Sequence, residues 1–220
     1  VIVAHSDRSK VVHIQGAGRQ FSATQGLTDF RSIVTDLGIT PGNQFISEFE
    51  QARVVLLVEG PDEVSAFRHA ADCYKEGNVI IESFEDMGVV LIPIGGCDSI
   101  KHWHTLNILR DLGKPFYVLQ DSDRGSEADD SPRAQTLLDL GLKTPEDFWV
   151  LNKRSLENYV NAGYLQRLLP GVTITYDDYT HVKNLCKSHP EAGRLGGKHF
   201  AERHFCQQTL EELRDSFKSG

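Results

Sequence analysis

The sequence lacks the features that mark several large classes of protein. None of its apolar runs approaches the ~20 residues that a membrane-spanning helix needs, and no signal-peptide pattern opens the chain. Low-complexity tracts and clear internal repeats are also missing, which argues against repeat arrays and long disordered segments. With 40% hydrophobic and 25% charged residues, the composition predicts a soluble globular protein that has no membrane partner.

Cysteine is scarce and scattered, which excludes the dense spacing of a secreted disulfide scaffold. We expect reduced thiols and a cytoplasmic location. Two of the cysteines and three late histidines are available as zinc ligands, but their spacing matches no compact tetrahedral pattern, and we expect no structural zinc. These five residues are Cys186, His189, His199, His204 and Cys206.

An excess of basic charge is absent as well. The formal net charge is −8, which argues against a generally basic surface for nucleic acid. It does not exclude such a partner, because a site with several carboxylates is negative until metal ions bind. Basic residues gather late in the chain, and we interpret them mainly as solvated surface. They are Lys183, Lys187, Arg194, Lys198 and Arg203.

The length of 220 residues suits one core with a smaller appendage. The chain opens on Val1 in a strand-like stretch, which suggests a processed product or a piece of a longer protein. We treat residues 1–52 as a lead-in with β-rich stretches (VIVA and KVVHI), a flexible connection over Gly16–Gln25 and a helix over Leu27–Leu37.

From Arg53 onward, strand and helix patterns alternate, which predicts a mainly parallel α/β sheet with right-handed crossovers. The expected strands are Val54–Val58, Val89–Ile94, Phe116–Leu119 and Phe148–Leu151, and the expected helices are 62–75, 99–112 and 133–140. Later signals are weaker. They indicate an extended piece over Val172–Tyr176 and a terminal helix over Lys198–Lys218.

Acidic residues follow the predicted strands at the edge where parallel sheets bind ligands. Glu59 and Glu63 bracket the turn after the first strand, Asp121 and Asp123 follow the third, and Glu157 lies in KRSLENY. Converging carboxylates repel one another unless protonated or neutralised by cations, and Mg²⁺ prefers oxygen ligands. The sequence therefore predicts a metal site and phosphoryl chemistry.

Two of these motifs have alternative interpretations. A D-x-D motif also occurs in phosphatase-like hydrolases, where Asp121 would be a nucleophile. That version normally continues with glycine and threonine or valine, whereas Arg124 and Gly125 follow here. Gly95-Gly96 is a common turn after a strand, and its functional interpretation is a close backbone approach to a phosphate.

Together these motifs resemble a Toprim domain, the metal-binding module of topoisomerases, primases and several nucleases. Glu59-Gly60, Gly95-Gly96 and Asp121-x-Asp123 carry the resemblance in the expected order. VLLVEGPDE and KRSLENY make the chain most similar to the OLD-family (overcoming lysogenization defect) endonucleases. The resemblance implies a Toprim-like, mainly parallel central sheet flanked by helices over 53–160, and a smaller, mostly helical part over 161–220. It also implies a preceding ATPase domain, absent here, to which residues 1–52 would belong and which would favour a homodimer.

The resemblance further implies a divalent-metal-dependent DNA endonuclease that uses two ions, Mg²⁺ or Mn²⁺. One ion would activate water, and the other would stabilise the leaving 3′ oxygen. It leaves open whether the enzyme nicks DNA or cuts both strands. The alternatives are a non-catalytic module that binds metal and nucleic acid, and the phosphatase-like hydrolase. The ligands implied are Glu59, Glu63, Asp121, Asp123 and Glu157, with Ser155 as a neutral ligand or as a residue that orients Glu157.

Two roles rest on single residues. The family uses a late lysine to stabilise charge on the phosphate. Lys198 in GGKHF is our candidate beside the catalytic Glu59 and Asp121, and Lys183 and Lys187 stay open. His5 could be the switch histidine of an ABC-type ATPase, but we favour an ordinary strand residue.

Overall fold

The structure is a computed structural model that describes residues 12–17, 20–25, 51–96, 99–100, 115–190, 192–193, 195–197 and 199–218. Several predictions lie outside these residues and stay predictions. They are the strand at VIVA, the helix 27–37, most of the helix 99–112, and the roles of His5 and Lys198. Among the helices described, none is long and apolar enough to cross a bilayer.

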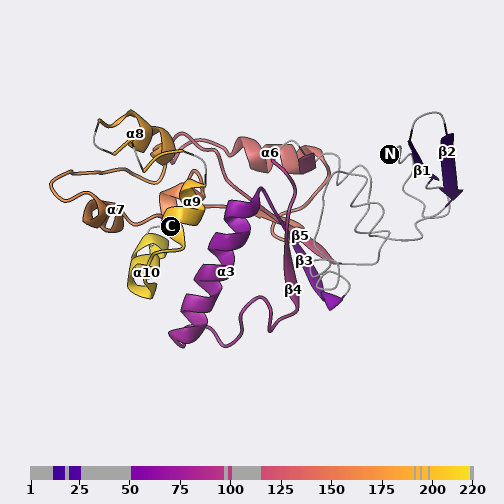
Figure 1. Ribbon diagram of the computed structural model, residues 1–220, viewed down its shortest axis with the longest axis horizontal. Helices are drawn as coiled ribbons and strands as arrows, with labels where there is room; N and C mark the ends of the chain where they lie inside the picture. The colour runs from indigo at the N-terminus through magenta and orange to yellow at the C-terminus, as the bar shows by residue number, and fades with distance from the viewer. Residues whose placement is uncertain are drawn as a thin grey trace.

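Four parallel strands form the central sheet, which confirms the predicted fold class. Their spatial order is β4-β3-β5-β6, so β3 lies between β4 and β5. The order places the ends of β3 and β5 side by side (Figure 1). The strands are β3 (Val54–Val58), β4 (Val89–Pro93), β5 (Phe116–Gln120) and β6 (Phe148–Val150).

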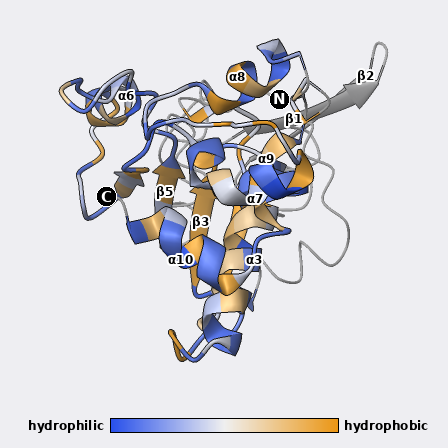
Figure 2. Ribbon diagram, turned by 90° about the vertical axis from the view of Figure 1, so that its left-hand side faces the viewer, coloured by the Kyte–Doolittle hydropathy of each residue, from blue (hydrophilic) through white to orange (hydrophobic). Residues whose placement is uncertain are grey.

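The sheet is buried on both faces, as continuous aliphatic runs in parallel strands predict. Val55 and Leu57 belong to one hydrophobic cluster, whereas Leu56 and Val58 belong to the other. Successive strand residues point to opposite faces, so each strand supplies both cores. Figure 2 shows β3 and β5 in the hydrophobic colour.

Two helices of the sheet region begin where the sequence predicts, to within a residue. α3 (Pro61–Glu76) starts after Gly60 with proline in its first turn, where the missing N–H has no intrahelical partner to lose. α6 (Pro132–Asp139) is capped by Ser131, whose Oγ accepts a hydrogen bond from the Ala134 N–H at 3.1 Å.

The C-terminal part is helical, but the single terminal helix predicted over 198–218 is wrong. The chain forms α9 (Phe200–Phe205) and α10 (Leu210–Lys218) instead. Thr209 and Glu212 exchange hydrogen bonds between side chain and backbone N–H, a capping box that starts a new helix. The extended piece over Val172–Tyr176 pairs with none of the described strands. The preceding elements are η3 (Leu156–Tyr159, a 3₁₀ turn), α7 (Ala162–Leu168) and α8 (Val182–Ser188).

The C-terminal helices share their core with the sheet. Leu56 on β3 and Phe67 on α3 lie in the same buried cluster as Phe200, Phe205 and Leu213. α9 and α10 pack against α3 (Figure 1), and η3 contacts both. This packing holds the C-terminal helices against the helix that starts at the Glu59 turn.

A separate antiparallel hairpin joins β1 (Val12–Ala17) and β2 (Gln20–Gln25). The flexible connection predicted over Gly16–Gln25 is therefore wrong. Apolar Phe21 and Ala23 alternate there with polar residues, and this period of two suits a strand.

Candidate metal-binding active site

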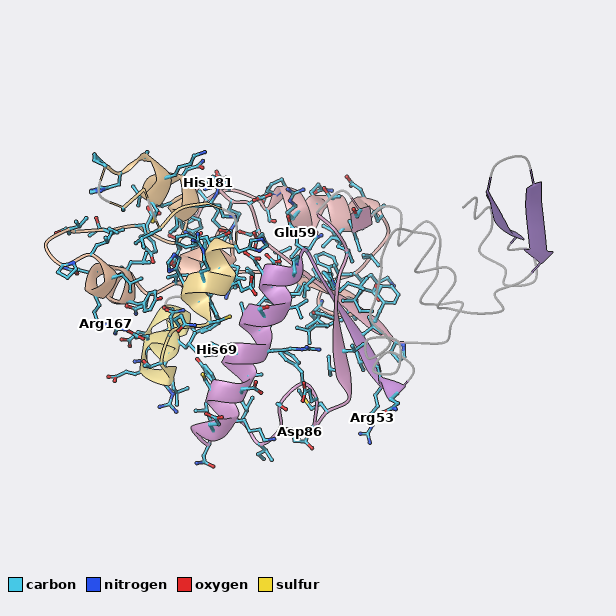
Figure 3. The ribbon with its side chains drawn as sticks, viewed as in Figure 1. Arg53, Glu59, His69, Asp86, Arg167 and His181 are labelled. Atoms are coloured by element: carbon cyan, nitrogen blue, oxygen red, sulfur yellow. The ribbon has the colours of Figure 1, made fainter. Side chains whose placement is uncertain are left out.

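The predicted acidic residues gather at the carboxyl edge of the sheet. Glu59 directly follows β3, and Figure 3 shows it at the opposite end of that strand from Arg53. Asp121 follows the neighbouring β5. η3 follows β6 in the chain, and its Leu156 N–H donates a hydrogen bond to Asp121 Oδ1 at 3.0 Å. Glu157, the next residue, is thereby brought to the same edge.

The pKa of the Asp121 carboxyl is raised well above its usual range. Burial is the main cause, and the nearby charges of Glu157, Glu59 and Glu63 add to it. The hydrogen bond from the Leu156 N–H acts in the opposite direction. Asp121 is therefore a partly buried acid that a positive charge in the site would ionise.

The pKa values of both glutamates at the β3–α3 turn are raised as well. Burial raises the pKa of Glu63 to about 6, with help from the charges of Glu59 and Glu157. Burial is also the main cause for Glu59, where Arg133 opposes it and Asp123 adds to it. Like-charge repulsion among carboxylates makes this edge receptive to cations.

Gly60 allows the turn to be this tight. A Cβ at Gly60 would lie 3.1 Å from Glu63 Oε2, closer than ordinary contact. The Glu63 carboxylate also accepts hydrogen bonds from the N–H groups of Gly60 and of Glu63 itself. The glycine therefore leaves room for Glu63 to fold back over the first turn of α3 toward Glu59.

Two basic side chains pair with the remaining acids. Arg133 Nε lies 2.6 Å from Asp123 Oδ2, and Lys183 Nζ lies 2.6 Å from Glu157 Oε1. Burial alone would raise the pKa of Glu157, but hydrogen bonds from Lys183 and Ser155 outweigh it and leave the pKa lowered. Sequence reasoning missed both pairs, since Arg133 on α6 and Lys183 on α8 reach the site only through the tertiary fold.

The segment after β6 is hydrogen-bonded to the residues that follow β5. Ser122, which lies between Asp121 and Asp123 in the sequence, is buried, and its Oγ donates to the Lys153 carbonyl at 2.8 Å. The Asp123 N–H donates to the Arg154 carbonyl at 2.9 Å.

Ser155 Oγ lies 3.0 Å from Asn158 Oδ1 and also hydrogen-bonds Glu157. Ser155 thus lies beside Glu157, and its role as a neutral ligand or as an orienting residue stays a prediction.

Asn158 and Lys153 anchor this segment to the following loop, and the sequence analysis did not single them out. Asn158 Nδ2 donates to the carbonyls of Asp177 and Thr180, at 3.0 and 2.8 Å. The Lys153 side chain is only 6% exposed and pairs with Asp178 at 2.8 Å. Both residues lie within KRSLENY, so the motif marks a buried polar scaffold as well as an acid.

Gly95 and Gly96 have φ angles of 83° and 108°, which favour glycine. The Gly96 N–H donates to the Glu59 carbonyl at 2.9 Å and so ties the end of β4 to the acidic edge. A phosphate at this turn would have to be held by other donors. Phosphate binding by the two glycines stays a prediction.

The donor set at this edge fits a hard divalent cation, because it consists of carboxylate oxygens that repel one another. Arg133 and Lys183 compensate part of that charge in the structure. Among the described residues, three ligand atoms that all lie within 4.8 Å of one another occur in a neighbouring group, Asp62, His199 and Glu202, and not among the five predicted carboxylates. The cysteines and other histidines considered for zinc form no such group within the described ranges.

Comparisons with known proteins agree with the sequence resemblance. The family model for the TOPRIM domain of overcoming lysogenization defect protein-like proteins matches residues 52–123. A search of curated protein sequences gave no match.

Two solved structures are also similar to the chain. The C-terminal region of the Burkholderia pseudomallei OLD protein shares 16% identity at a TM-score of 0.46, over 76% of this chain and 96% of that one. The C-terminal region of the Xanthomonas campestris pv. campestris OLD protein shares 16% identity at a TM-score of 0.42, over 78% of this chain and 93% of that one.

Proposed function

We propose that the chain is a divalent-metal-dependent DNA endonuclease, because residues 52–123 match the family model for the TOPRIM domain of overcoming lysogenization defect protein-like proteins. The observation that carries the proposal is the acidic edge of the sheet. There Glu59, Glu63 and Asp121 share one site, and burial and mutual repulsion raise all three pKa values. A divalent cation would offset the repulsion among these carboxylates and stabilise their ionised forms.

Five carboxylates would hold the ions, and we assign Ser155 to orient one of them, Glu157. Two ions of Mg²⁺ or Mn²⁺, when bound, would supply an activated water and charge stabilisation for the leaving 3′ oxygen. Glu59 and Asp121 are the central ligands because they end adjacent strands of the sheet. The full set is Glu59, Glu63, Asp121, Asp123 and Glu157.

Lys183 is the described lysine best placed to act on the phosphate. Its ammonium lies 2.6 Å from Glu157 Oε1. Partial burial lowers its pKa, but the hydrogen bond from Lys183 to Glu157 and the charges of Asp62 and Asp121 raise it overall. A fixed positive charge at this edge can stabilise the negative charge that develops on a phosphodiester. Lys198, the first candidate from the sequence, lies outside the described residues and stays a candidate.

The remaining assignments are proposals about the longer protein. Residues 1–52 would end an ATPase domain, 53–160 would form the catalytic domain, and 161–220 would form its helical extension. An ATPase partner of the ABC type would favour a homodimer that acts on DNA.

Cleavage of supercoiled plasmid tests the proposal. With Mg²⁺ or Mn²⁺ we expect nicked or linear DNA, and EDTA should abolish the products. Asp121→Asn should lose activity while the circular dichroism spectrum stays native. Metal-independent cleavage, or full activity in Asp121→Asn, would contradict the proposal. No cleavage with either metal would favour a non-catalytic binding module.

Single-turnover cleavage at saturating DNA separates the two lysines. Loss of a phosphate-stabilising charge should lower the rate by about 10²–10³-fold. We expect this loss in Lys183→Met and a nearly full rate in Lys187→Met, the control one turn further along α8. If Lys198→Met shows the large loss and Lys183→Met does not, the assignment to Lys183 is wrong.

A further inference from the structure

Asp62, His199 and Glu202 converge beside the acidic edge, although the first two lie 137 residues apart in the chain. Asp62 is in the first turn of α3, His199 directly precedes α9, and Glu202 is in the first turn of α9. His199 Nδ1 lies 2.9 Å from Asp62 Oδ1 and 3.5 Å from Glu202 Oε2. All three ligand atoms lie within 4.8 Å of one another.

We propose that these three residues bind a first-row transition-metal dication, with Zn²⁺ as the type ion, at a site separate from the proposed catalytic ions. The donor set contains one imidazole nitrogen and two carboxylate oxygens. Imidazole suits Zn²⁺, Co²⁺ and Ni²⁺, whereas Mg²⁺ prefers oxygen alone. Among the described residues, no histidine forms a ligand group with Glu59 or Glu63.

Three ligands from two elements are the number found in open zinc sites, where water completes the coordination. Asp62 supplies a fixed oxygen, since its side chain is only 18% exposed. The side chains of His199 and Glu202 are about half exposed, at 56% and 51%, so an ion can enter from solvent.

Two neighbouring side chains, His204 and Cys206, do not add a further ligand to the site. His204 is buried, and neither of its ring nitrogens belongs to the group of ligand atoms that lie within 4.8 Å of one another. Cys206 is close enough for the charges of Glu202 and Asp62 to act on it. Its Sγ does not belong to the group of ligand atoms that lie within 4.8 Å of one another. The site therefore consists of Asp62, His199 and Glu202.

The ion would clamp α9 to the first turn of α3. α9 already packs along α3 through the shared core (Figure 1). The clamp lies one residue from Glu63, so it would hold the C-terminal helices next to the acidic edge. Binding to the folded state alone would raise the melting temperature.

The test uses untagged protein in which Glu59→Gln and Asp121→Asn remove the main ligands of the proposed catalytic ions. Zn²⁺ binding is measured by calorimetry without DNA, and zinc X-ray absorption reports an imidazole ligand. We expect one equivalent of Zn²⁺, an imidazole signal and a raised melting temperature. Mg²⁺ at the same concentration should reproduce none of these effects.

His199→Asn removes the imidazole but keeps the backbone, because asparagine tolerates the φ of 57° at this position. It should weaken Zn²⁺ binding by more than about tenfold, the lower end of the loss when only an outer-shell partner of a ligand is removed. Glu202→Gln should weaken binding in the same direction. The matched control is His181→Asn, which changes another histidine at a helix N-cap.

Two results would overturn the site: no Zn²⁺ binding by the starting protein, or unchanged binding in both His199→Asn and Glu202→Gln. Because no DNA is present, these results are independent of the plasmid assay. The metal clamp can therefore fail while the endonuclease proposal stands, and the reverse also holds.

Discussion

Glu63 makes the metal-free protein sensitive to pH. Its pKa is raised from 4.5 to about 6 in the folded state, so the protonated form stabilises the fold. That contribution is complete below pH 4.5 and is lost as the pH rises through about 6. The shift corresponds to about 2 kcal/mol, since one pKa unit is about 1.4 kcal/mol.

Urea unfolding in EDTA measures this effect against Glu63→Gln, which cannot ionise. Relative to the wild type, the variant should gain about 2 kcal/mol between pH 4.5 and pH 7.5. Saturating Mg²⁺ at pH 7.5 should make the wild type more stable to urea than Glu63→Gln, because Mg²⁺ stabilises the ionised carboxylate of the wild type. A stability difference that does not change with pH would contradict the assigned repulsion.

At the scale of elements, the break between α9 and α10 depends on the capping box. The Thr209 N–H donates to Glu212 Oε2 at 2.9 Å, and Glu212 also pairs with Arg167 on α7. Thr209→Ala should cost about 1 kcal/mol of unfolding free energy, whereas Thr209→Ser should cost little. Urea denaturation of both variants checks this. Equal losses in the two variants would exclude the cap as the cause.

The elements differ in how readily the sequence predicts them. β3 and β4 are continuous aliphatic runs, and both strand positions were predicted to within one residue. The start of α10 was missed, although Thr209-Leu-Glu-Glu212 carries a capping-box pattern. Local sequence patterns therefore predict an element where its residues are continuously apolar or where a capping pattern marks its start.

The site was only partly predictable for a different reason. Acids that end adjacent strands converge by a general rule of parallel sheets, so Glu59 and Asp121 could be predicted to meet. The cations beside them could not, because Arg133 and Lys183 belong to helices whose packing no local pattern specifies. The same limit applies to His199, which approaches Asp62 only through the packing of α9 on α3.

At the scale of the whole molecule, the sheet and the C-terminal helices should unfold together. Leu56 and Phe67 share one buried cluster with Phe200, Phe205 and Leu213, so one face of the sheet closes its core only with the C-terminal helices. Calorimetry of the chain should show one unfolding transition for the sheet and the C-terminal helices. A fragment that ends at residue 160 should show no cooperative unfolding transition. A stable, cooperatively folded fragment 53–160 would contradict the shared core.

The central claim is that the acidic edge of the sheet binds divalent metal ions. Anomalous diffraction from crystals soaked in Mn²⁺ tests it most directly, because the peaks locate the ions and their ligands. We expect a peak between Glu59 and Asp121, and its loss in Asp121→Asn crystals. Density confined to other parts of the protein, with none at this edge in well-soaked crystals, would contradict the account.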